Sequence, residues 1–165
     1  MDQGTEFVAR AVMIGVGATI VMDLWAILLK RTFSIPSLGY QVVGRWLANM
    51  PSGKFRHDNI LKVAPMPGEA VIGWTAHYVI GVLFAALLLA TVGLGWARAP
   101  TFLPALLMGV VTVAAPFLVM QPGFGFGIAA SKTPAPNTAR MRSLMTHTVF
   151  GIGLYLAAML TKSVI

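Results

Sequence analysis

The chain has 165 residues, of which 57% are hydrophobic and only 10% are charged, and its mean hydropathy is +0.79. Because a soluble domain has about 25% charged residues, this composition excludes an ordinary soluble protein and predicts a single transmembrane domain over residues 1–165. The net charge is +7, and we expect the basic residues to contact anionic lipid, since no nucleic-acid-binding motif is present. The lack of cysteine excludes disulfides and thiolate metal sites.

Four apolar runs are each long enough to form one membrane-crossing helix: residues 7–29, 70–94, 101–120 and 143–161. A helix rises about 1.5 Å per residue, so roughly 20 residues cross a hydrocarbon core of about 30 Å. The runs predict an all-α fold, an integral membrane bundle of four helices. No signal-peptide cleavage pattern follows the acidic N-terminus, so we expect the first helix to remain in the mature protein.

Within residues 11–29 the first run carries a single charged side chain, Asp23. A carboxylate at the centre of a membrane helix costs about 2.5 to 3.5 kcal/mol and usually faces a protein interior. Asp23 shares its i, i+4 row with Gly15 and Thr19, and membrane helices approach each other closely along such small faces. We therefore expect Asp23 to lie among the other helices, and Arg10 to extend toward the outer interface.

The first large connection, residues 30–69, contains a stretch at 37–50 in which apolar residues recur at helical spacing. This pattern predicts a short helix lying in the membrane interface, with Tyr40 and Trp46 at headgroup level. A lid packed on the bundle is the alternative. Further along this connection, Asp58 is expected to cap a short turn of helix.

The second large connection, residues 121–142, opens with the run GFGFG, whose spacing fits no nucleotide-binding loop. We expect a re-entrant or tightly packed turn there. The polar part that follows is a candidate site for a phosphate or a lipid headgroup, formed by Ser131, Lys132, Arg140 and Arg142. The alternative is that its basic residues only retain the connection in the cytoplasm.

The basic residues also predict the orientation of the helices. Most of the 12 Lys and Arg residues lie in the two large connections: Lys30, Arg31, Arg45, Lys54, Arg56, Lys62, Lys132, Arg140 and Arg142. Alternation of four helices places both connections on one side of the membrane, and positive-inside bias makes that side the cytoplasm. We therefore expect the N- and C-termini outside the cytoplasm.

Three ionisable side chains are expected at a similar depth, close to the side of the large connections. Asp23 and His77 lie roughly 10 Å into their helices from that side, and His147 roughly 7 Å. Thr19, on the row of Asp23, and Thr112 are expected to line the same region. Pro116 leaves the backbone carbonyl of Thr112 without its helical hydrogen bond, so this carbonyl is a further polar group there. The depths predict one polar intramembrane site.

Three interpretations of this site stay open. Its side chains can form interhelical hydrogen bonds that only fix helix packing. They can instead titrate in a proton-linked or ion-linked cavity, which is the usual hypothesis for ionisable groups inside a membrane. Asp23, His77 and His147 are also candidate ligands for a metal or haem, although no HExxH motif is present and the cofactor is unknown.

Six motifs are distributed along the chain: MDLWA at 22–26, VGRW at 43–46, FRHD at 55–58, GWTAHY at 73–78, QPGFGFGIAASKTPAPN at 121–137 and HTVFGIGLY at 147–155. Together they resemble a family of small four-span bacterial inner-membrane proteins that is known only as a domain of unknown function. The resemblance extends over nearly the whole chain and implies a multi-pass protein of the bacterial inner membrane. It implies no activity and no functional residues.

We therefore expect a small membrane protein that transports or binds a small solute or ion through the polar intramembrane site. No nucleophile and base occur at recognisable spacing, so no catalytic residue is predicted. The alternatives are a non-catalytic subunit of a larger membrane complex, a metal- or haem-binding membrane protein, and an enzyme acting on lipid. The small helix faces would suit a homo-oligomer or a partner membrane subunit.

Overall fold

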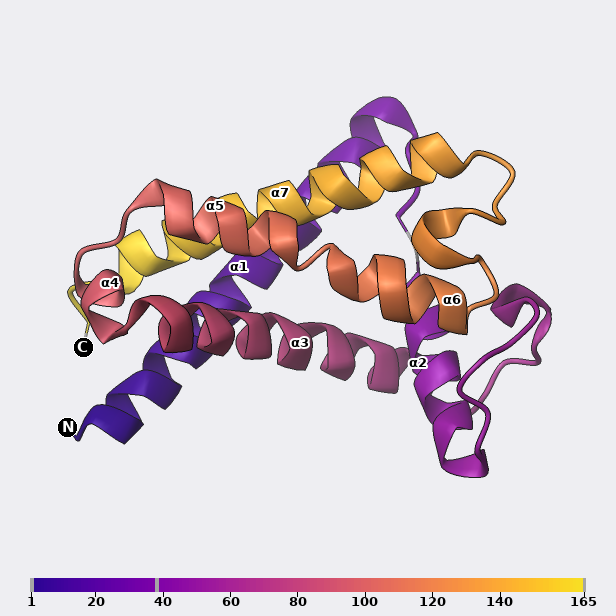
Figure 1. The fold of residues 1–165 in the computed structure, drawn as a ribbon, viewed down its shortest axis with the longest axis horizontal. Helices are drawn as coiled ribbons and strands as arrows, with labels where there is room; N and C mark the ends of the chain where they lie inside the picture. The colour runs from indigo at the N-terminus through magenta and orange to yellow at the C-terminus, as the bar shows by residue number, and fades with distance from the viewer. Residues whose placement is uncertain (1, 38, 165) are drawn as a thin grey trace. The chain divides into compact units, whose positions relative to one another are not determined.

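The computed structural model describes residues 2–37 and 39–164, and all regular elements within these ranges are helical (Figure 1). Four helical segments in them are long and apolar enough to cross a membrane: α1 at Gln3–Phe33, α3 at Glu69–Val92, a composite segment at Phe102–Gly123, and α7 at Pro136–Thr161. Each of them overlaps one of the four predicted runs, although α1 begins at Gln3 and α7 at Pro136, before the predicted starts at residues 7 and 143. The predicted all-α membrane fold is confirmed.

The shorter elements lie between these segments: α2 at Tyr40–Asn49, α4 at Leu94–Arg98, and 3₁₀ turns η1 at Met50–Ser52, η2 at Ile60–Lys62 and η4 at Ile128–Ala130. The helix α2 is the short helix predicted at 37–50, where residue 38 lies outside the described residues. Its predicted position in the membrane interface stays a prediction.

The third spanning segment is interrupted. The helix α5 ends at Val111, and after a turn the chain continues as a π-helix, η3 at Pro116–Met120, and a last short helix, α6 at Gln121–Gly123. Pro116 has no N–H and its ring crowds the preceding turn, so the regular hydrogen-bond ladder cannot run through it. The sequence pattern predicted one continuous run here.

The chain forms two compact units. The first comprises Met1–Pro36, Tyr78–Thr112 and Met145–Ile165, and the second comprises Ser37–His77 and Val113–Leu144. Both α3 and α7 therefore contribute residues to each unit.

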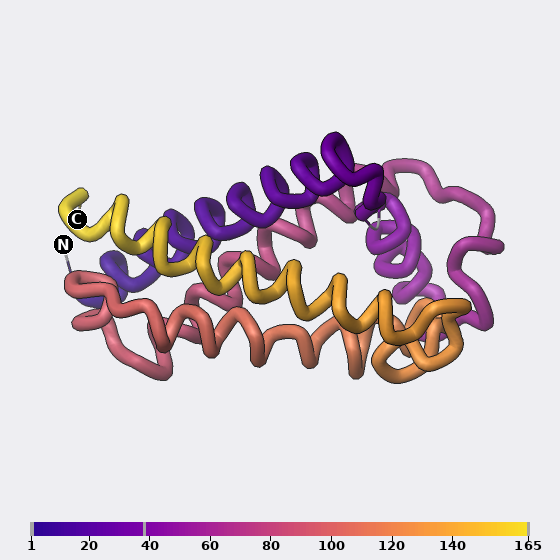
Figure 2. The backbone as a smooth tube through the Cα atoms, turned by 90° about the horizontal axis from the view of Figure 1, so that it is seen from above, coloured from indigo at the N-terminus to yellow at the C-terminus, as the bar shows by residue number. Residues whose placement is uncertain are grey.

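The first unit is a four-helix bundle made by parts of α1, α3, α5 and α7, which lie side by side (Figures 1 and 2). Figure 2 shows that α1 begins and α7 ends at the same end of this unit. Its core contains fully buried Ile14, Leu88 and Leu154. Small residues bring the helix backbones together where Gly15 faces Val82, Gly81 faces Thr19, Gly109 faces Gly151 and Gly153 faces Ala18.

At the end of the first unit where α1 begins, two arginines bind one carboxylate. Arg10 is 1% exposed and its Nε lies 2.8 Å from Glu6 Oε1, while Arg98 Nη2 lies 2.6 Å from Glu6 Oε2. The bonds to Glu6 raise the pKa of the Arg98 guanidinium above its usual range. Glu6 lies one helical turn nearer the start of α1 and allows the Arg10 guanidinium to be buried. The expectation that Arg10 extends toward the outer interface stays a prediction.

The second unit has its own core, in which α2 packs on parts of both large connections. Val42, Val43 and Trp46 from α2 surround Ile60 and Phe124, which are fully buried. On its other side α2 lies against the first turns of α3. A side chain at Gly44 or Gly73 would overlap the backbone of the other helix, so the two helices touch through their glycines.

Arg45 connects α2 to the start of α3 within the second unit. Its guanidinium donates to both Glu69 oxygens, at 2.8 and 2.9 Å, and to the Val63 carbonyl at 2.8 Å. These bonds to Glu69 raise the pKa of Arg45, against the lowering effect of its burial. The basic residues of the connections were expected to orient the helices by their charge, but this one is buried and paired.

Candidate functional site

Asp23 lies on α1 in the first unit and is partly buried. Its Oδ2 accepts a hydrogen bond of 3.0 Å from the hydroxyl group of Tyr78 on α3. This bond joins two spanning helices through an ionisable pair. Sequence reasoning missed Tyr78, although it directly follows the histidine that was chosen on the same helix.

Thr112 and His147 form a second interhelical contact in the first unit, at the end of α5 and on α7. Thr112 Oγ1 lies 2.9 Å from His147 Nδ1 and donates its own hydrogen to the Gly109 carbonyl at 2.7 Å. Either atom can be the donor of the bond between Thr112 Oγ1 and His147 Nδ1, depending on the tautomer of the imidazole ring. The structure therefore brings together two of the predicted site residues.

Both contacts lie at the same level of the first unit. Gly153 on α7 lies against Ala18 on α1, and the two helices are antiparallel. From that contact, Asp23 lies about 7 Å further along α1, and His147 lies about 9 Å back along α7, in the same direction. All four helices thus contribute a polar side chain at one level: Asp23, Tyr78, Thr112 and His147.

Thr19 is fully buried, and its hydroxyl group donates to the Gly15 carbonyl at 2.8 Å, one turn earlier on α1. A hydroxyl group that donates to a carbonyl of its own helix needs no hydrogen-bond acceptor from another helix. Its side chain lies against Gly81, where α1 and α3 meet. The lining role of Thr19 stays a prediction.

His77 belongs to the second unit, where aromatic rings surround it. Its ring stacks on Tyr40 with the centroids 3.9 Å apart and an interplanar angle of 23°, and it meets the edge of Trp74 at 5.9 Å. Tyr40 and Trp74 also contact each other at 4.6 Å. The predicted meeting of His77 with Asp23 and His147 stays a prediction.

No group of three His, Asp or Glu side chains within residues 2–37 and 39–164 is arranged to bind a metal ion. The interpretation of Asp23, His77 and His147 as metal or haem ligands stays a prediction.

The candidate anion site in the second connection is a set of exposed side chains. Ser131, Lys132, Arg140 and Arg142 are all exposed. Arg140 donates to the Ala129 carbonyl at 2.8 Å and to Asn137 Oδ1 at 3.0 Å, so part of its donor capacity serves the local fold. Its role in binding an anion stays a prediction.

Four long apolar helices, with a polar level between them, define a helical membrane protein. The chain belongs to the DUF2938 family, described as a protein of unknown function, whose family profile matches residues 12–161. This membership confirms the resemblance to a family of unknown function that the sequence motifs indicated. No curated protein and no solved structure matches the chain.

Proposed function

We propose that the protein binds and transports a proton or another small ion, with Asp23 as the charged group of the site. The observation that supports this most is the placement of Asp23 beside Tyr78 at the level of the Thr112–His147 contact. Ionisable side chains inside a membrane are costly, and they commonly mark ion pathways and proton relays.

The geometry suits exchange of a proton better than a fixed structural bond alone. A carboxylate has about four acceptor positions, so the bond from Tyr78 is compatible with binding a proton or a cation. The imidazole of His147, which is hydrogen-bonded to Thr112 through Nδ1, is a second ionisable side chain. Two ionisable side chains thus lie at one level of the first unit.

We expect Asp23→Asn to reduce proton flux at least tenfold in proteoliposomes that contain a pH-sensitive dye and are driven by an imposed pH gradient. Asparagine keeps the shape of the side chain and can still accept from Tyr78, but it does not titrate. The matched control is Asp2→Asn, because Asp2 is an exposed cap of α1 and asparagine caps equally well. Equal flux in wild-type and Asp23→Asn vesicles would contradict the proposal.

We further propose that the two large connections face the cytoplasm of a bacterial inner membrane and that both termini lie outside it. The basic residues of the connections support this orientation. The chain has no cysteine, so single cysteines can be placed at the exposed positions Lys54 and Lys162 without a background signal. A membrane-impermeant maleimide should label Lys162→Cys in intact cells and Lys54→Cys only after lysis. The reverse pattern would overturn the orientation.

The small-residue faces no longer argue for an oligomer. Gly15, Gly81, Gly109 and Gly151 lie against helices of the same chain. A homo-oligomer or a partner subunit would have to pack through other surfaces, such as the exposed apolar residues Leu83, Leu107 and Leu160. These residues equally suit contact with lipid.

A further inference from the structure

Two sequence motifs that the proposed function does not use meet in the second unit. The segment FRHD at 55–58 lies against the glycine-rich turn at 121–127 through two backbone hydrogen bonds. His57 N–H donates to the Gly123 carbonyl at 2.9 Å, and Ile60 N–H donates to the Phe124 carbonyl at 3.0 Å. The indole N–H of Trp46 fixes the beginning of this segment by donating to the Phe55 carbonyl at 2.8 Å.

The contact between these motifs is close-packed. Gly125 has a φ of +86°, and a side chain there would overlap the Asp58 carbonyl oxygen. Beneath the segment, Ile60 and Phe124 are both fully buried. The backbone from Phe55 to Ile60 is therefore held in place by hydrogen bonds and buried side chains, and its exposed side chains extend from this ordered backbone.

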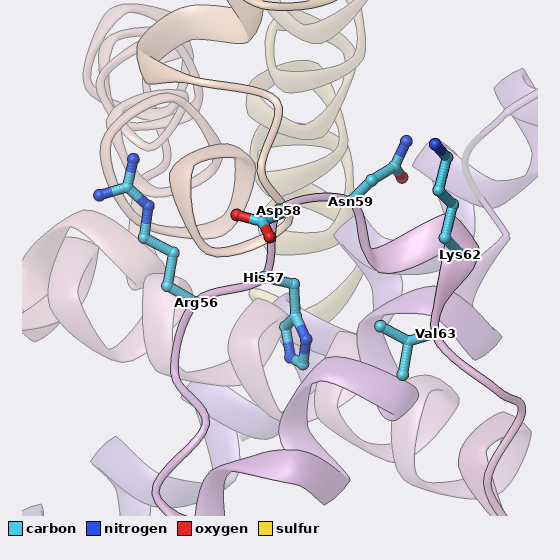
Figure 3. Close-up of a pocket in the computed structure, with 6 residues that line it drawn as sticks. All are labelled: Arg56, His57, Asp58, Asn59, Lys62 and Val63. Atoms are coloured by element: carbon cyan, nitrogen blue, oxygen red, sulfur yellow. The ribbon is translucent and has the colours of Figure 1, made fainter.

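An open cavity of about 650 Å³ lies along this segment. Six residues line it: Arg56, His57, Asp58, Asn59, Lys62 and Val63. Figure 3 shows Arg56 and Lys62 on opposite sides, with Asp58 and Asn59 between them. The lining is thus mostly polar and carries two permanent positive charges and one negative charge.

The two cations are available for a ligand. Arg56 and Lys62 are exposed, and neither side chain makes an ion pair or hydrogen bond with another part of the described chain. The Asp58 carboxylate between them is not paired with either one. Asn59, and not Asp58 as predicted, caps the turn η2: its Oδ1 accepts from the Leu61 N–H at 2.9 Å, and its amide NH₂ remains as a donor.

A buried polar atom at the same cavity also lacks a partner. His57 Nε2 is shielded from solvent and makes no hydrogen bond. Such an atom costs about 1 to 3 kcal/mol unless a ligand or an ordered water reaches it. Since His57 Nε2 is shielded, the groups that the cavity offers to a ligand are the two unpaired cations and the amide donor.

We propose that this cavity binds the phosphate group of a ligand, with Arg56 and Lys62 contacting its oxygens and the Asn59 amide donating a further hydrogen bond. Guanidinium and ammonium groups form strong charge-assisted bonds to phosphate. Asp58 opposes a highly charged anion and tunes the affinity of the site. The site lies outside the proposed ion pathway and does not depend on it. The phosphate can belong to a soluble ion or to a lipid headgroup.

The test compares charge variants of the full-length protein in nanodiscs of zwitterionic lipid, titrated with inorganic phosphate by calorimetry. We expect Arg56→Gln and Lys62→Gln each to weaken binding at least fivefold. The matched control Lys54→Gln removes the same charge from an exposed position that does not line the cavity, and it should change binding less than twofold. Asp58→Asn should strengthen binding, because it removes a negative charge facing the anion.

A second arm distinguishes the source of the phosphate. Wild-type protein and the same variants are equilibrated with mixed vesicles of phosphatidylglycerol and phosphatidylcholine, and retained lipid is counted by native mass spectrometry. Retention of phosphatidylglycerol with the same order of variants, without binding of inorganic phosphate, assigns the site to a headgroup. Binding of neither probe, or equal weakening by Lys54→Gln and Lys62→Gln, would overturn the proposal, since the effect would then be diffuse charge.

Discussion

The substitution Gly73→Ala is expected to prevent the close packing of α2 on α3 in the second unit. An added Cβ would overlap the Tyr40 carbonyl oxygen, and Gly44 makes the reciprocal contact with the Glu69 carbonyl. Both obstacles are backbone atoms, so no side-chain rotation can relieve the overlap. Overpacking of this kind lowers the free energy of unfolding by about 1 to 3 kcal/mol. Because the neighbouring atoms are backbone, we expect the loss for Gly73→Ala to be near the upper end of that range.

We expect the midpoint of thermal unfolding in mild detergent to fall by about 6 °C or more for Gly73→Ala. The tryptophan fluorescence should report it, because Trp46 lies in the core of the same unit. Gly95→Ala is the matched control, since Gly95 is helical and no atom lies within 4 Å of the position of its Cβ. A Gly73→Ala protein that melts together with the Gly95→Ala protein would show that the two helices can separate freely.

The spanning helices could be predicted from the sequence because each is a long run of apolar residues. The break in the third segment needed a comparison of its two prolines. Pro104 lies in the first turn of α5, where the missing N–H has no helical partner to lose, so the helix tolerates it. Pro116 lies well inside the run, where the same ring ends the regular ladder and begins a π-helix.

The depth argument counts residues along α3, and such a count cannot choose between neighbouring side chains as a partner for Asp23. His77 and Tyr78 differ by about 1.5 Å in depth, while their side chains leave the helix about 100° apart. Depth follows from counting residues along one helix, whereas direction depends on how neighbouring helices are rotated. The hydroxyl group of Tyr78 donates to Asp23, and no count from the membrane surface could distinguish Tyr78 from His77 as a donor.

The burial of Arg10 and Arg45 was not predicted from the sequence, because it also depends on which side chains pack against them. A basic residue next to an apolar run is usually taken as a charge at the membrane surface. The partner of Arg10, Glu6, lies one turn away and gave a local signal that could have been used. The partner of Arg45 is Glu69, which lies in another helix, so only the folded second unit brings them together.

Breaking the Arg45–Glu69 ion pair is also expected to lower the thermal stability of the protein strongly. The two side chains are only 11% and 13% exposed, and they meet through two bonds of 2.8 and 2.9 Å. Glu69 Oε2 also accepts from the Met66 N–H at 2.8 Å, so the pair joins α2, the preceding loop and α3. We expect Arg45→Met to lower the midpoint of thermal unfolding by about 6 °C or more, because it leaves a largely buried carboxylate without its partner.

The matched control for this variant is Arg98→Met, which removes an arginine from the Glu6 pair. The Arg98 side chain is 57% exposed, and Glu6 retains Arg10 as a partner, so the midpoint should move by no more than about 4 °C. The double variant Arg45→Met with Glu69→Gln should melt above Arg45→Met alone, because it removes the unpaired carboxylate. Equal shifts for Arg45→Met and Arg98→Met would mean that burial does not strengthen the pair. A double variant less stable than Arg45→Met would mean instead that the negative charge of Glu69 in the first turn of α3 stabilises that helix without the arginine.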